Sequence, residues 1–462
     1  MILSTRILLQ MRESLYTHPS PHNTNEMTKP VVHTYPNGLR LVYERPTSVS
    51  NQTIVRAFVH VGSVNEPDSI RGASHFIEHM CFKGTRSLHT WREVNEPFSH
   101  SGAFFNATTT KQHTCFKVNC LDSHTFEFLA IVADMLLNSK FDPQEYKREL
   151  NVVREEVKLR QPNSYIENLA FEGTPYEKWT DHLSYHKPGC LPHNPVVEYY
   201  KEHYNPQNMV LSVVSSIPFD KIRSCIAKTA FGKMLHSPLV KPILNPQSCH
   251  LVQNESRYSV KSTDGATSYI ELAVRVGNQF NDPEYHVLKV LEQILGGSMS
   301  ARLFVELREK RGLTYNSAAH FNLYEPAGVF ALCAKTDTAR LLKDGSKPGV
   351  LPTLIMMIDD LIKNGVKESE VRWAKQRIGE LAIMNDSDLV QKCEHNGERV
   401  MLHNDVEIRN YKDLQKMYYK NITKAVVDGL IHKYFAPRVF YLSIIGGKLP
   451  RKSEIARVMD KK

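Results

Sequence analysis

The sequence predicts an α+β protein with two related α+β domains from an internal duplication, each a mainly antiparallel sheet covered by helices. Length is the first observation: 462 residues are too many for one ordinary core and suit two domains of about 100–200 residues each. Repetition is the second, because each half has an alternating strand that ends on a glycine and leads into a helix, at 53–83 and again at 268–295. This repeated order of strand, glycine and helix indicates that one half of the chain arose by duplication of the other.

The first half opens with a hairpin signal at 31–43, where Asn37-Gly38 separates two runs of β-branched and aromatic residues. Periodicity and the positions of glycine and proline predict the elements that follow. They are, in order, a strand at 53–61, a short buried helix at 73–83, a polar loop at 106–112, a strand at 115–118, helices at 123–137 and 144–160, an irregular region to about 206, a strand at 209–214 and a helix at 222–231.

The two halves are joined by a stretch without periodicity that carries Pro238, Pro242 and Pro246. We expect a linker there, at 232–258. A strand at 268–276 and a helix at 285–295 then open the second half. The expected division is a flexible tail over 1–30, a first domain over 31–231 and a second domain over 259–462.

Composition excludes several classes of protein. Hydrophobic residues make up 41% and charged residues 23% of the chain, which is typical of soluble globular proteins. The net charge of +9 is spread without a long basic block, so we expect no nucleic-acid partner. No run approaches the roughly 18 apolar residues that span a bilayer, and we expect no transmembrane segment.

Cysteine usage indicates the compartment. The eight cysteines are scattered without a C-x-x-C pair, which favours reduced thiols over a disulfide framework. No cysteine is expected to bind metal. Residues 1–12 carry two arginines and no acid, a faint likeness to an organelle transit peptide. We therefore expect a soluble protein inside the cell, in a cytosol-like compartment or the mitochondrial matrix.

The strongest chemical signal is the run from His75 to His79, with Glu78 between them. On a helix, positions i, i+3 and i+4 share one face, so both imidazoles can reach one ion. Zinc favours imidazole and carboxylate ligands and leaves a fourth position for water when it is catalytic. Glu78 is then placed to act as the general base. The alternative, a histidine pair on a helix surface, is weakened by Phe76 and Ile77, which predict a buried helix.

The helix predicted at 144–160 offers a candidate for the third metal ligand. Its apolar residues form one stripe, and at about 100° per residue Glu156 lies near the border of that stripe, whereas Glu155 points away from it. Glu149 shares the face of Glu156 and could support a ligand or the water. A surface role remains the alternative for each glutamate taken alone.

The run Gly72–Thr85 resembles the inverted zinc motif of the pitrilysin/insulinase peptidase family, in its short-chain branch with the mitochondrial processing peptidase β-subunit and small bacterial zinc proteases. Other segments resemble the family in the same order: 62–67 the loop before the zinc helix, 102–108 a substrate-binding segment, and 295–315 an arginine/tyrosine segment. The likeness covers most of 31–447. It implies one Zn²⁺ per chain, held by His75, His79 and Glu156 in the first domain, and a metal-free second domain.

The resemblance also implies roles in substrate binding. Asn106 matches the asparagine that helps to hold a substrate backbone, and Arg308 and Tyr315 would reach from the second domain to bind the substrate or polarise its scissile carbonyl. The implied substrate is a peptide or unfolded protein segment, and the implied assembly is a homodimer or a heterodimer with a related chain. A non-catalytic relative that acts as a structural or peptide-binding subunit is the alternative function. The intact zinc ligands and Glu78 argue against it.

Overall fold

The computed structural model describes residues 29–47, 50–159, 164–177, 191–234, 255–279, 282–385, 387–405 and 407–459. These residues form two compact units. The first consists of the described parts of Met1–Arg154, Leu183–Lys241 and Asn385–Ile408, and the second of those of Glu155–His182, Pro242–Met384 and Arg409–Lys462. Neither unit is one continuous stretch of chain.

The first unit is built on a six-stranded sheet, as far as the chain is described, in the order β1-β2-β6-β3-β5-β4. Its strands are β1 (Val31–Thr34), β2 (Arg40–Glu44), β3 (Gln52–Val59), β4 (Phe104–Thr109), β5 (Thr114–Leu121) and β6 (Met209–Val214). The hairpin predicted around Asn37-Gly38 is the antiparallel pair β1–β2. Only β2 and β6 run parallel among these strands.

The second unit repeats this topology in a sheet whose described strands follow the order β7-β13-β8-β10-β9. They are β7 (Arg257–Ser262), β8 (Thr267–Val276), β9 (Thr314–Leu323), β10 (Gly328–Asp337) and β13 (Tyr441–Gly446). The pair β7–β13 is parallel, as β2–β6 is, and the other pairs are antiparallel. The fold class predicted from the sequence, two related α+β domains, is confirmed.

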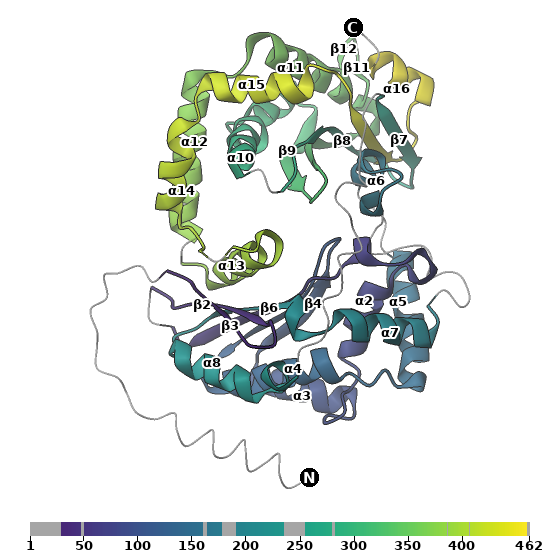
Figure 1. Cartoon of the computed structure of the whole chain (residues 1–462). Coiled ribbons are helices and arrows are strands. Elements are labelled where there is room, and N and C mark those ends of the chain that lie inside the picture. The colour runs from purple at the N-terminus through teal and green to yellow at the C-terminus, as the bar shows by residue number, and fades with distance from the viewer. Residues whose placement is uncertain are drawn as a thin grey trace. The chain divides into compact units, whose positions relative to one another are not determined.

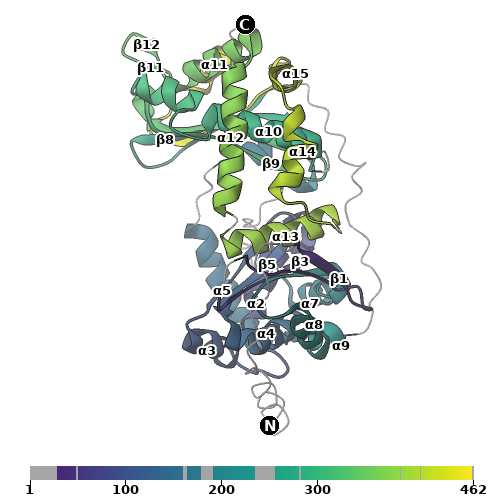
Figure 2. The ribbon, with the colours of Figure 1, turned by 90° about the vertical axis from the view of Figure 1, so that its left-hand side faces the viewer.

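Helices cover both faces of the first sheet (Figures 1 and 2). In the first unit they are α2 (Ala73–Cys81), α3 (Trp91–Ser101), α4 (Thr125–Asn138), most of α5 (Pro143–Leu159), α7 (His193–His203), α8 (Phe219–Lys228), α9 (Ala230–Lys233) and α13 (Leu389–His403). Figures 1 and 2 both show α13 on one face of the sheet, with α4 and α8 on the other. The helix α13 therefore comes from the second half of the chain but completes the first unit.

The second unit, in turn, contains a helix from the first half of the chain. Its helices are α6 (Ile166–Ala170), α10 (Asp282–Gly296), α11 (Val350–Asn364), α12 (Glu368–Asn385), α14 (Tyr411–Met417), α15 (Lys424–Phe435) and α16 (Lys452–Met459). A large apolar core joins one sheet face to α10, α11 and α15. Helix α6, from the first half of the chain, lies against β7, β8 and β13. None of the helices in the described residues is both long and apolar enough to cross a membrane.

The grouping into units differs from the contiguous division predicted at 232–258, because segments of each half pack on the sheet of the other. The expected tail and linker fall largely outside the described residues, and β7 already begins at Arg257.

Two other expectations were wrong. The loop expected at 106–112 is in its first part strand β4, which pairs with β5 and leaves the polar side chain of Asn106 exposed. The irregular region before residue 206 contains α7, whose Val196, Tyr199 and Tyr200 are buried at helical spacing. Pro195 obscured this helix in the sequence, although proline is tolerated in a first helical turn.

Polar and apolar contacts together hold α13 on the first sheet. Glu394 accepts a hydrogen bond from Nε of the buried Arg56 at 3.1 Å, and Lys392 pairs with the buried Glu44 at 2.9 Å. The apolar contact centres on Gly397, where a Cβ atom would collide with the ring of the buried Phe58. The helix thus needs glycine at this position because the sheet approaches its backbone closely.

We predict that Gly397→Ala destabilises the protein by about 1–3 kcal/mol, because the new methyl group overpacks the contact with Phe58. Gly429→Ala is the matched control, since Gly429 lies within helix α15 and its Cβ would meet only open space. Alanine favours a helix interior over glycine by about 1 kcal/mol, so the control should be neutral or stabilising. Denaturant unfolding of both variants measures the difference, and equal effects would refute the close contact.

Two neighbouring histidines of the first unit are kept neutral by the fold. Burial lowers the pKa of His113 to about 4, and the charges of His60 and Lys117 act in the same direction. Burial, followed by the charge of Arg40, also lowers the pKa of His60 to about 4. Both imidazoles therefore stay neutral in the folded protein at a pH where those of the unfolded chain are already protonated.

We predict that stability falls as the pH drops from about 6.5 to about 4. Above this window both histidines are neutral in the folded and the unfolded chain, and stability does not depend on their titration. Within the window only the unfolded chain takes up protons, which lowers the free energy of unfolding. Each histidine can contribute up to about 1.4 kcal/mol per pH unit. Urea unfolding across this range should show a shallower slope for His113→Gln than for the wild type. His432→Gln, at an exposed position on α15, should leave the slope unchanged; parallel curves for all three proteins would contradict the prediction.

Candidate metal centre

The helix α2 is held in place at its N-terminus by a buried carboxylate. Gly72, at φ +95°, precedes the helix in a left-handed conformation. Glu66 Oε2 accepts a hydrogen bond from the Gly72 N–H at 2.6 Å, and Glu66 Oε1 one from the Ser74 N–H at 2.8 Å. A negative charge at this end satisfies backbone donors and favours the helix dipole. Sequence reasoning missed this role of Glu66, although the residue lies in the segment 62–67 that resembles the family.

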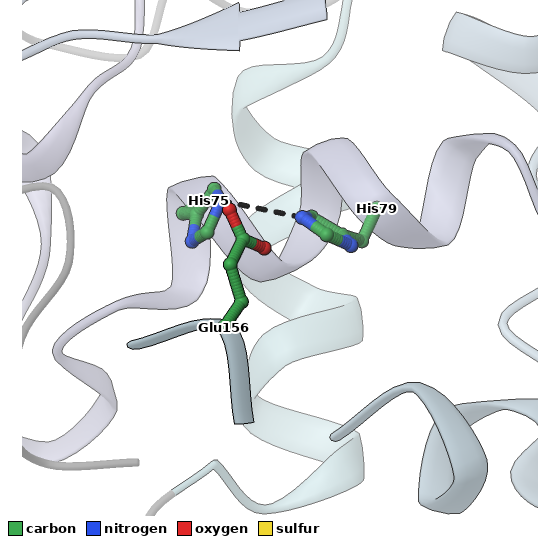
Figure 3. Close-up of side chains that lie close together, drawn as sticks. All are labelled: His75, His79 and Glu156. Atoms are coloured by element: carbon green, nitrogen blue, oxygen red, sulfur yellow. Dashed lines mark hydrogen bonds between the residues drawn. The ribbon is translucent and has the colours of Figure 1, made fainter. Parts of the chain in front are cut away.

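His75 and His79 lie one turn apart on α2, and their Nε2 atoms are 3.2 Å from each other (Figure 3). Two imidazole nitrogens bound to one tetrahedral zinc ion are separated by about 3.3 Å, given metal–nitrogen bonds of about 2.0–2.1 Å. His75 is buried and His79 partly exposed. The pair thus has the spacing of two ligands of one ion.

Glu156 reaches the histidine pair from α5, as Figure 3 shows. One donor atom from each of His75, His79 and Glu156 lies within 4.8 Å of the other two. Its neighbour Glu155 has a side chain that is 68% exposed and pairs with Lys158 at 2.5 Å. The helical argument that separated these two glutamates agrees with their positions.

Glu149 lies on α5 behind His79 and supports it. Glu149 Oε1 is 2.8 Å from His79 Nδ1, and its Oε2 is 2.5 Å from Lys83 Nζ. Burial raises the pKa of the Glu149 carboxyl, but the hydrogen bonds from His79 and Lys83 outweigh it and hold the pKa below its usual value. Because a carboxylate only accepts hydrogen bonds, Nδ1 is the donor in this contact, and Nε2 is the ring nitrogen that remains to bind a metal ion.

Glu78 is buried on the same helix, between the two histidines in sequence. Thr109, on the edge strand β4, donates a hydrogen bond from Oγ1 to Glu78 Oε2 at 2.5 Å. This bond fixes the carboxylate and ties α2 to the end of β4. Sequence reasoning did not identify Thr109, because the contact joins residues 31 positions apart.

The donor set fits zinc. Two imidazole nitrogens and one carboxylate oxygen form a three-ligand set typical of catalytic zinc, in which water takes the fourth position. The carboxylate that orients His79 is the usual outer partner of such a ligand. The residues that would hold the metal are therefore His75, His79 and Glu156.

The three residues expected to bind substrate lie on two different units. Asn106 is exposed on β4, where its Oδ1 accepts a hydrogen bond from the Ala107 N–H at 2.8 Å. Arg308 and Tyr315 belong to the second unit and contact each other, with the guanidinium 4.9 Å from the Tyr315 ring centroid. Tyr315 is 82% exposed. Their roles in substrate binding stay predictions.

Family models match both halves of the chain. Residues 42–182 match the model described as insulinase (peptidase family M16), and residues 193–378 match the model described as the peptidase M16 inactive domain. All of the candidate ligands lie within the first of these ranges. The helix α13 lies beyond the second.

Two bacterial proteins have similar sequences. A protein of Bacillus subtilis named as an uncharacterized zinc protease is 29% identical over 379 residues, covering 80% of this chain and 88% of that protein. A second, from Streptomyces coelicolor and also named as an uncharacterized zinc protease, is 26% identical over 354 residues, covering 73% of each chain.

Solved structures share the fold. A protease from Helicobacter pylori superimposes with a TM-score of 0.77 at 19% identity, covering 91% of this chain and 100% of that one. A peptidase M16 inactive domain from Pseudomonas fluorescens superimposes with a TM-score of 0.75 at 16% identity, covering 92% and 99%. At these identities the likeness concerns the fold alone.

We predict that Glu149→Gln lowers the affinity for zinc by about 10–100-fold, because the neutral amide orients His79 less firmly and makes it a weaker ligand. Glu155→Gln, on the same helix but facing solvent, is the matched control and should bind zinc like the wild type. Competition with a chromophoric chelator at constant pH measures both affinities. An undiminished affinity of the Glu149 variant would contradict its supporting role.

Proposed function

This chain belongs to the insulinase-type peptidases of family M16, and we propose that it is a zinc-dependent endopeptidase that hydrolyses peptides or short unfolded protein segments. The observation that carries the proposal is the meeting of His75, His79 and Glu156 beside the buried carboxylate of Glu78. Such a set supplies both a metal site and a base, the two requirements of metal-assisted hydrolysis. The names of the bacterial relatives agree with this class of activity.

Zinc bound by these ligands would lower the pKa of a coordinated water toward about 7 and polarise the substrate carbonyl. Glu78 accepts the proton of the attacking water on its carboxylate and then delivers it to the leaving nitrogen, since the same group can serve as base and acid in turn. Thr109 keeps that carboxylate oriented through the bond to Oε2. Glu149 keeps the Nε2 lone pair of His79 directed at the metal position.

The edge strand β4 is the proposed docking site for the substrate. Among the described strands β4 pairs only with β5, so its outer edge can add an extended peptide through main-chain hydrogen bonds. Thr109 at the end of this strand contacts Glu78, which places the edge next to the proposed base. Asn106 lies exposed on the same strand and would bind the peptide backbone. Arg308 and Tyr315 are proposed to complete substrate binding, and a dimer stays a prediction from the sequence.

The alternative is a non-catalytic subunit with the same fold. The matching model described as inactive covers 193–378, which contains none of the proposed zinc ligands. Catalysis is therefore proposed only for the first half of the chain. A purely structural role would not require Glu78, His75, His79 and Glu149 to be assembled around one point.

We predict that Glu78→Gln keeps zinc but loses peptide cleavage by at least about 100-fold, because the amide cannot accept a proton from water. Glu96→Gln is the matched control, since Glu96 is partly exposed on α3 and pairs only with Arg92 among the ion pairs described. Zinc content and cleavage of a mixed peptide library would be measured for the wild type and both variants.

Each outcome separates the two functions. Zinc in all three proteins with cleavage lost only in Glu78→Gln supports the proposal. Full activity of that variant would overturn the assigned mechanism. Zinc without any cleavage in the wild type would favour the non-catalytic alternative.

A further inference from the structure

A second group of potential metal ligands lies in the second unit, on three adjacent strands. Glu271 is on β8, His320 on β9 and Cys333 on β10. One donor atom from each residue lies within 4.8 Å of the other two. Within the described residues, this is the one further cluster of this kind besides that on α2 and α5.

Strand register explains why these residues meet. Cys333 lies directly opposite Glu271 in the antiparallel pair β8–β10. On the other side Cys333 lies opposite Ala318, so His320, two residues further along β9, points to the same face. Ile270 and Leu272, which flank Glu271, point to the apolar core on the opposite face. The three polar side chains therefore share the face that does not pack on that core.

Two residues of the cluster are buried, and the third is partly exposed to solvent. Glu271 and Cys333 are buried, whereas the His320 side chain is 40% exposed. His320 Nδ1 is 3.9 Å from Cys333 Sγ, and His320 Nε2 is 3.8 Å from Glu271 Oε1. Tyr269 donates a hydrogen bond from its hydroxyl to Glu271 Oε1 at 2.9 Å. A solvent ion can thus reach the cluster past the imidazole.

We propose that Glu271, His320 and Cys333 bind a second metal ion per chain, a thiophilic divalent cation such as zinc. A tetrahedral zinc ion separates thiolate sulfur from imidazole nitrogen by about 3.6 Å, and nitrogen from carboxylate oxygen by about 3.4 Å. The two observed separations involve different ring nitrogens, Nδ1 toward Cys333 and Nε2 toward Glu271, and one ion binds only one of them. The partly exposed imidazole therefore has to turn so that a single nitrogen faces both groups, and one donor atom from each residue already lies within 4.8 Å of the other two. Tyr269 is then the outer partner of the carboxylate.

This site departs from the sequence-based expectations of one zinc per chain, a metal-free second domain and no cysteine ligand. The spacing of 271, 320 and 333 has no motif-like regularity. Only the register of the three strands brings the residues together. The new site is independent of the proposed peptidase activity.

A nucleophilic role for Cys333 fits the geometry less well. Burial raises the pKa of the Cys333 thiol above its usual value, and reactive cysteines instead have a lowered pKa and an exposed sulfur. The distance of 3.9 Å to His320 is also long for activation of the thiol. A metal ion, in contrast, displaces the thiol proton: the cation and the thiol give a metal–thiolate bond and one released proton.

Cobalt titration tests the site separately from the proposed zinc site. Co²⁺ replaces zinc in both kinds of site, but only a cysteine ligand produces a thiolate-to-cobalt charge-transfer band in the near ultraviolet. The ligands on α2 and α5 include no sulfur. We expect wild-type protein, treated with chelator and then titrated with cobalt chloride under reducing conditions, to develop this band and to bind two ions per chain.

Matched variants assign the band. Cys333→Ser should abolish it and reduce binding to one ion, and His320→Ala, at a partly exposed position that tolerates substitution, should weaken binding at least tenfold. Cys225→Ser, which removes another buried thiol on α8, and His75→Ala should both retain the band. Absence of the band in the wild type, or its persistence in Cys333→Ser, would overturn the proposal. Circular dichroism of each variant confirms that the fold is retained.

Discussion

The helix α2 brings ionisable side chains into an apolar environment, and the first unit is organised around the need to satisfy them. A buried polar group without a hydrogen bond costs several kcal/mol, and His79, Glu78 and the N–H groups at the start of this helix have partners from other elements. Glu66 accepts the N–H groups at the helix start, Glu149 on α5 lies against His79, and Thr109 on β4 donates to Glu78. The proposed zinc site thus depends on two helices, α2 and α5, together with one loop and the edge strand β4.

The two units show how one topology supports different chemistry. In the first, the candidate ligands His75 and His79 follow the helical period and meet because they are four residues apart. The corresponding stretch of the second unit is α10, where Leu288, Leu291 and Ile294 occupy the core instead. The polar cluster of the second unit lies on strands instead, where Glu271 and Cys333 meet because they are opposite each other across one ladder. Helical and cross-strand neighbours are both about 5 Å apart at Cβ, which suits a shared ion.

The sequence was most informative where structure depends on local periodicity. The strands β3, β6 and β8, the helix α2 and the different orientations of Glu155 and Glu156 all follow from patterns within single elements. Contacts between distant elements were missed, among them Glu66 with the α2 N-terminus and Thr109 with Glu78. The cluster at Cys333 was missed for the same reason, since it depends on the register of three strands. Periodicity shows which face a residue occupies but not what that face meets.

The positions of α6 and α13 are the clearest example of a contact that periodicity does not predict. They also help to hold the fold together. Each half of the chain contributes a helix to the sheet of the other half, so neither sheet is covered by its own half alone. Around α13 the contact includes the buried residues Arg56 and Phe58, and without this helix they would be exposed on the sheet. The matching family ranges, 42–182 and 193–378, end before α13 begins. The structural unit that carries His75, Glu78 and His79 therefore extends beyond the stretch in which these residues are found.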